Sequence, residues 1–115
     1  MYHFSYAEVL DDSSADMRAR ERLALERSIE LLQKAEAAGP LSREAVDANH
    51  FSVKLWTILV EDLGMAENQL PKQLRADLVS IGLWVLKELD EIRMERSTNF
   101  RGVIEVTQSI SAGLA

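Results

Sequence analysis

Between Leu74 and Ile92 an apolar residue recurs every three or four positions, and this spacing predicts a long helix with one buried face. The residues of this seam are Leu74, Leu78, Ile81, Val85, Leu89 and Ile92. Pro71 is pre-set for the first position of such a helix, which we expect to run from residue 71 to about residue 96. Gly82 costs about 1 kcal/mol relative to alanine inside a helix, and a close crossing by a neighbouring helix is one physical reason for it.

The same periodicity predicts three further helices, over residues 16–38, 43–63 and 100–112. Ser42 is a good N-cap for the second of these helices, and Gly64 supplies a residue that can adopt a left-handed conformation at its end. Three candidate N-caps precede the last helix, and they are Ser97, Thr98 and Asn99. The predicted helices are therefore joined by short connections that contain the signals for helix ends and helix starts.

We predict an all-α fold, a small single-domain bundle of about four helices in which the second and third helices are central and the most apolar. A chain of 115 residues buries about two-thirds of its surface on folding, which is enough for one hydrophobic core. The helical domain is expected to span residues 16–115. Residues 1–15 are expected to form an N-terminal arm, either mobile or docked on the bundle through Tyr2, Phe4 and Tyr6.

The charge and the residue content exclude several classes of function. Thirteen Lys and Arg residues against nineteen Asp and Glu residues give a net charge of −6, which disfavours a broad basic face for nucleic acid. The chain has no cysteine, and His3 and His50 lack the spacing of metal ligands, so we expect no metal and no cofactor. No signal peptide and no run of 18 apolar residues is visible, so we expect a cytoplasmic protein that does not cross a membrane.

The sequence contains no recognisable catalytic motif. Adjacent carboxylates such as Glu61 and Asp62 point in different directions on a helix, so they are poorly placed for shared acid–base work. His50 lies one turn from Asp47, but no nucleophile is implied nearby. Phosphate-binding loops, hydrolase elbows and dinucleotide fingerprints are also missing. We therefore expect a protein that is not an enzyme.

The second and third predicted helices carry more apolar residues than one buried stripe requires. Two shorter flanking helices would leave part of this surface uncovered, as an apolar groove of the kind that binds an amphipathic helix. A homodimer interface would produce the same pattern. Tryptophan in a bundle is more often core than contact site. We expect the groove to be drawn from Leu55, Trp56, Leu59, Leu78, Ile81, Trp84 and Val85, with Arg75 as a charge at its rim.

Several of these residues belong to short motifs. The central motif reads Asn68-Gln69-Leu70-Pro71, then Leu74-Arg75-Ala76, then Leu78-Val79-Ser80-Ile81-Gly82-Leu83-Trp84-Val85. Leu55-Trp56-Thr57 lies upstream, and Val103-Ile104-Glu105-Val106 with Ile110 and Gly113-Leu114 lies downstream. Together these motifs resemble the signature of the FlaF family of flagellar-biosynthesis regulators. The resemblance covers the chain from about residue 51 to residue 114.

The resemblance implies a small, non-enzymatic cytoplasmic protein that is needed for flagellin production. Members of the family are held to bind flagellin and to act with the regulator FlbT on its synthesis and export. Flagellin polymerises through terminal amphipathic helices, so the implied role is a flagellin-binding chaperone and post-transcriptional regulator that holds such a helix in the groove. Two alternatives remain open. One is an RNA-binding regulator of flagellin mRNA, which the negative charge disfavours, and the other is a dimeric adaptor that binds FlbT.

Overall fold

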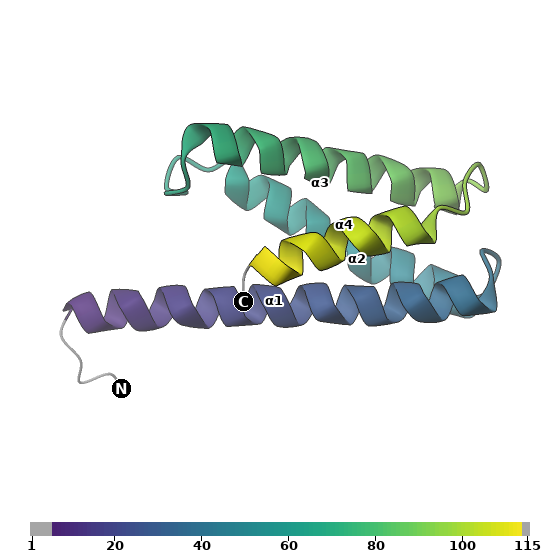
Figure 1. Ribbon diagram of the computed structural model, residues 1–115, viewed down its shortest axis with the longest axis horizontal. Helices are drawn as coiled ribbons and strands as arrows, with labels where there is room; N and C mark the ends of the chain where they lie inside the picture. Colours follow the sequence, from purple (N-terminus) through teal and green to yellow (C-terminus); the bar gives the residue numbers. More distant parts are fainter. Residues whose placement is uncertain (1–5, 114–115) are drawn as a thin grey trace.

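The computed structural model shows four helices among the residues that it describes (Figure 1). The structure describes the backbone of residues 6–113 and the side chains from residue 18 to residue 113. The helices are α1 (Tyr6–Ala38), α2 (Arg43–Leu63), α3 (Lys72–Arg93) and α4 (Phe100–Gly113). The predicted all-α bundle of four helices is therefore confirmed. None of the described helices combines the length and the apolar character that crossing a membrane would require.

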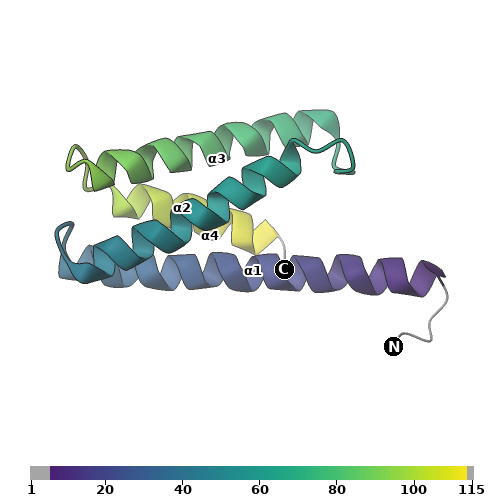
Figure 2. The ribbon, with the colours of Figure 1, turned by 180° about the vertical axis from the view of Figure 1, so that it is seen from behind.

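The helices are arranged with α1 and α3 on opposite sides and with α2 and α4 between them (Figures 1 and 2). Within the described residues, α1 and α3 make no close backbone contact, whereas α2 and α4 each pack against both. The sequence pattern placed the second and third helices at the centre. The short α4 takes a central place because its buried residues, Phe100, Val103, Ile104, Thr107 and Ser111, cover a broad face of the helix.

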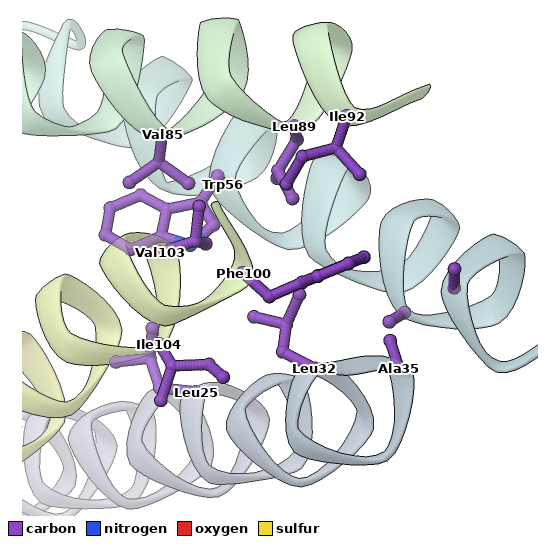
Figure 3. Close-up of a cluster of buried hydrophobic side chains, with 12 residues drawn as sticks. Leu25, Leu32, Ala35, Trp56, Val85, Leu89, Ile92, Phe100, Val103 and Ile104 are labelled. Carbon is purple, nitrogen blue, oxygen red and sulfur yellow. The ribbon is translucent and has the colours of Figure 1, made fainter. Parts of the chain in front are cut away.

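The hydrophobic core takes residues from all four helices (Figure 3). Its large members are Leu25, Leu32, Trp56, Val85, Leu89, Ile92, Phe100, Val103 and Ile104. Ala35, Ala45 and Ala48 are also buried, and their small side chains let α1 and α2 approach closely near the turn that joins them. The predicted apolar seam of α3 therefore faces this core through Val85, Leu89 and Ile92.

The crossing of α2 and α3 depends on Gly82, as the sequence suggested. A Cβ atom at Gly82 would lie 2.5 Å from Cγ2 of Val60 and 3.4 Å from Cε3 of Trp56. Real Cβ contacts are not that short, so any larger residue would force the two helices or their side chains to shift. The absence of a side chain at Gly82 therefore makes room for the Val60 side chain against the α3 backbone, while Trp56 would meet the added Cβ atom at an ordinary contact distance.

Two predicted helix starts are confirmed by their hydrogen bonds. The Ser42 hydroxyl accepts from the Ala45 backbone N–H at 3.1 Å, so Ser42 caps α2. The Asn99 carboxamide oxygen accepts from the Gly102 N–H at 3.0 Å and caps α4 in the same way. Both caps satisfy a backbone donor that has no partner inside its own helix.

Two other helix ends differ from the sequence prediction. Gly64 has a φ of −84°, so it is right-handed and does not end α2 in the expected left-handed conformation. Positive φ angles occur instead after α1, at Gly39 with a φ of 104°, and after α3, at Glu95 with a φ of 61°. The bonds after α3 show how that helix ends. There the Arg96 N–H donates to the Glu91 carbonyl at 2.8 Å and the Glu95 N–H donates to the Ile92 carbonyl at 3.1 Å. This pair of bonds is the Schellman pattern, and it ends α3 at Arg93 rather than at residue 96.

The first helix begins at Tyr6 and not at Asp16. No glycine or proline lies between these positions, so nothing in the backbone breaks the helix at the predicted capping sequence. Residues 6–15 of the expected arm are thus helical. Tyr2 and Phe4, which the prediction also assigned to the arm, lie outside the described residues.

Candidate functional site

A cleft of about 510 Å³ opens beside the core between α1, the second half of α2 and the loop that joins α2 to α3. We call it the α1–α2 cleft. Its apolar lining consists of Leu25, Trp56, Leu59, Leu63, Leu70, Leu78 and Ile110. Its polar lining consists of Arg18, Glu21, Asp62, Asn68 and Gln69. All four helices contribute to it, with Leu78 from α3 and Ile110 from α4.

The loop that forms one end of this cleft is held by side-chain hydrogen bonds. The Asn68 amide nitrogen donates to the Asp62 carboxylate at 3.2 Å, and the Asn68 carboxamide oxygen accepts from the Leu70 N–H at 3.1 Å. From α3, the Arg75 guanidinium donates to the Met65 carbonyl at 3.1 Å. These bonds fix the position of Leu70 at the cleft and restrain the Asp62 carboxylate.

Two carboxylates lie at the cleft on facing helices. Glu21 of α1 is half-buried, and this burial raises the pKa of its carboxyl above the ordinary value of 4.5. The nearby Asp62 carboxylate of α2 raises the Glu21 pKa further. Among the described residues that line the cleft, the only cation is Arg18. The cleft therefore carries more negative than positive charge.

Trp56 belongs both to the core and to the cleft. Its side chain is 3% exposed and packs within the core cluster, and in the view of Figure 3 the indole lies between Val85 and Val103. The buried indole N–H has no hydrogen-bond acceptor among the described residues. An unmet donor of this kind costs about 1–3 kcal/mol, which an acceptor or a water would relieve.

The structure places three of the eight predicted groove residues at the cleft, namely Trp56, Leu59 and Leu78. Leu55 and Ile81 are half-buried and pack against the core cluster, away from the cleft lining. The groove as predicted, along the middle of the second and third helices, is therefore largely closed by the core.

The other three predicted residues lie elsewhere. Val85 is completely buried and belongs to the core, so it offers no surface to a partner in this conformation. Trp84 is 40% exposed but lies on a different face of α3 from Leu78. Arg75 binds the loop through Met65 and is not among the cleft residues.

Sequence reasoning missed much of the lining, above all the wall that α1 provides. Arg18, Glu21 and Leu25 lie far from the second and third helices in sequence, and only the packing of α1 on α2 brings them to the site. A signal for four of the six other missed residues was present in the motifs, but not for Asp62 and Leu63. Asn68, Gln69, Leu70 and Ile110 all belong to the segments that resemble the FlaF signature.

A second hollow, of about 570 Å³, lies between α2 and α3. Five of its seven lining residues are polar or charged, among them His50, Lys54, Asp90 and Arg93. The α1–α2 cleft is the stronger candidate for an apolar ligand because it presents more apolar surface than this hollow.

A comparison of the chain with models of known protein families identifies its family. A family model described as flagellar protein FlaF matches residues 2–114, nearly the whole chain. The chain belongs to the FlaF family. The resemblance seen in the motifs is thus confirmed, and membership of the FlaF family gives the protein a flagellum-related role. No curated protein and no solved structure matches the chain.

Proposed function

We propose that this FlaF-family protein is a non-enzymatic cytoplasmic chaperone that binds flagellin and thereby regulates flagellin synthesis. It holds an amphipathic flagellin helix in the α1–α2 cleft. FlbT is a further partner in this proposal. The observation that supports this proposal is the apolar cleft beside the core in a member of the FlaF family. Its lining includes Asn68, Gln69, Leu70, Leu78 and Ile110, which belong to the motifs that resemble the FlaF signature.

The cleft suits a helix with one apolar face. Its accessible apolar residues are Leu59, Leu63, Leu70, Leu78 and Ile110. An amphipathic helix gains binding free energy by burying its apolar stripe against them. The polar residues of the cleft, including Asn68 and Gln69, can meet the polar flank of such a helix. A segment that folds on binding loses part of this gain to ordering, so the chaperone can still release it.

The test compares two leucines that are similarly exposed. Leu70 lies at the cleft and is 42% exposed, whereas Leu83 lies on α3 outside the cleft and is 54% exposed. Leu70→Asp is expected to abolish co-purification of flagellin from cells that produce both proteins. Leu83→Asp, the matched control, is expected to retain it. Circular dichroism of both variants should show an unchanged helical spectrum and thermal transition.

Equal flagellin binding by wild type and Leu70→Asp would overturn the cleft as the binding site. Leu78→Ala is a second variant for the same test, because it removes apolar surface from the α3 side of the cleft without adding a charge. We expect weaker flagellin binding from Leu78→Ala as well. Failure of the wild-type protein to bind flagellin in any condition would overturn the chaperone proposal itself.

An adaptor role is a second candidate, and the exposed side chains of α3 favour it. Leu83 and Trp84 are both large, apolar and exposed on this helix. A homodimer or a complex with FlbT would cover such residues. Light scattering of the wild type and of Trp84→Ala would show a change in mass if this face forms an interface.

A further inference from the structure

We propose that the α1–α2 cleft selects a helix that carries a lysine or arginine beside its apolar stripe, and that the Glu21 and Asp62 carboxylates bind this cation. The inference rests on the proposed function, because it specifies the chemistry of the segment that the cleft holds. It also predicts which segments the cleft rejects, namely those that present an acidic residue at the same position.

The two carboxylates stand next to apolar lining residues on facing helices. Glu21 precedes Leu25 by one helical turn on α1, so the two side chains lie on the same face. Asp62 follows Leu59 by three residues on α2, and both also line the cleft. Leu25 is completely buried, so a helix in the cleft would contact Leu59, and a cation that flanks its apolar stripe would lie beside both carboxylates.

The charges around Glu21 favour a cation from outside. Burial is the larger cause of the raised Glu21 pKa, and repulsion by the Asp62 carboxylate raises it further, so Glu21 is poorly compensated in the free protein. Arg18 is the one cation among the described cleft residues, against the two carboxylates Glu21 and Asp62. The Arg22 guanidinium, next along α1, lies 3.6 Å from the Glu26 carboxylate instead. The described cleft residues of α3 and α4, Leu78 and Ile110, bring no charge.

Asp62 is restrained in a way that suits recognition. The Asn68 amide nitrogen donates to its carboxylate at 3.2 Å, so the carboxylate keeps its place at the cleft. A preorganised carboxylate binds a cation with a smaller loss of side-chain freedom than a mobile one. Charge pairs of this kind contribute mainly to the choice between partners.

The test uses three synthetic amphipathic peptides with the same leucine stripe and one variable flanking position, occupied by lysine, glutamine or glutamate. Binding to the full-length protein is followed by Trp56 fluorescence in a Trp84→Phe background, because Trp56 lines the cleft and Trp84 does not. We expect the lysine peptide to bind about tenfold more tightly than the glutamine peptide, and the glutamate peptide to bind most weakly. Glu21→Gln should remove most of this preference.

Glu26→Gln is the matched control, since Glu26 is an exposed carboxylate on the same helix outside the cleft. It should preserve the preference for lysine. Equal affinity for the three peptides, or equal effects of Glu21→Gln and Glu26→Gln, would overturn the inference.

Flagellin co-purification separates this inference from the proposed function. Retention of flagellin by the wild type together with indifference to the peptide charge would reject only the cation site. A clear lysine preference without any flagellin binding would reject only the flagellin proposal.

Discussion

The hydroxyl oxygens of Ser28 on α1 and Ser52 on α2 lie 2.6 Å apart, completely buried, in the interface between the two helices. One of the two hydroxyls donates its proton directly to the other. This hydrogen bond therefore fixes the register of α1 on α2, and hence the position of the α1 wall of the cleft.

Ser28→Ala should destabilise the protein by about 1–2 kcal/mol, because it leaves the Ser52 hydroxyl buried without its partner. The double variant Ser28→Ala/Ser52→Ala should be more stable than the sum of the single changes predicts, since it leaves no unmet hydroxyl. Urea unfolding followed by circular dichroism measures all three free energies. Strict additivity of the two losses would show that the hydroxyls do not depend on each other.

Gly82→Ala should lower the free energy of unfolding by about 1 kcal/mol, even though alanine favours a helix by a similar amount. The reason is the contact of the new Cβ atom with Val60, which must move. Val60→Ala in the same chain should recover part of the loss. Gly113→Ala is the control, because a Cβ atom there would meet none of the described residues within 4 Å beyond its own helix backbone and chain neighbours, and it should not destabilise.

Glu95→Gly should stabilise the protein by roughly 0.5–1 kcal/mol. Glu95 holds a left-handed conformation with a φ of 61°, which costs a residue with a side chain about 1–2 kcal/mol and costs glycine little. The greater freedom of glycine in the unfolded chain offsets part of the gain. Thermal unfolding would measure the effect, and Glu95→Ala, which removes the charge and keeps the strain, should not reproduce it.

Glu21→Gln should stabilise the free protein at neutral pH while it weakens binding of a cationic helix. Because the folded-state pKa of Glu21 is raised, its contribution to stability is fully present below pH 4.5 and is lost as the pH rises through the raised pKa. The variant lacks this loss, so we expect a gain of about 0.5 kcal/mol at pH 7, limited by water at this half-buried site, and none at pH 3. Unfolding curves at pH 7 and pH 3 measure the change in the free energy of unfolding. A stabilisation found only at pH 3 would contradict the prediction.

Local signals in the sequence predicted much of the fold. Ser42 and Asn99 act within their own turns, so their capping could be read from neighbouring residues alone. Gly82 was also informative, because a glycine inside a strong helical pattern needs a close neighbour to explain it. The end of α2 was less predictable, since glycine can adopt a right-handed or a left-handed backbone conformation, and the path of the following loop determines which one Gly64 adopts.

The cleft could be predicted only in part, because its two walls come from separate regions of the chain. The apolar pattern of α2 and α3 included Leu59 and Leu78, which the structure places at the cleft. It could not show that Trp56 is enclosed while Trp84 is exposed, since that depends on where α4 packs. Nor could it place Glu21 beside Asp62, a proximity that exists only once α1 lies along α2.

Trp56 joins the interior of the bundle to the site that we propose for flagellin. Its ring lies against Gly82 where α2 and α3 cross, and it also lines the cleft, so a helix bound in the cleft adds contacts to the same side chain that holds the fold together. Any ligand that binds only the native state raises its stability by mass action. Under the proposed function, loss of flagellin would leave the empty protein as the form that unfolds more readily, and proteolysis of that form would tie the lifetime of this protein to the supply of flagellin.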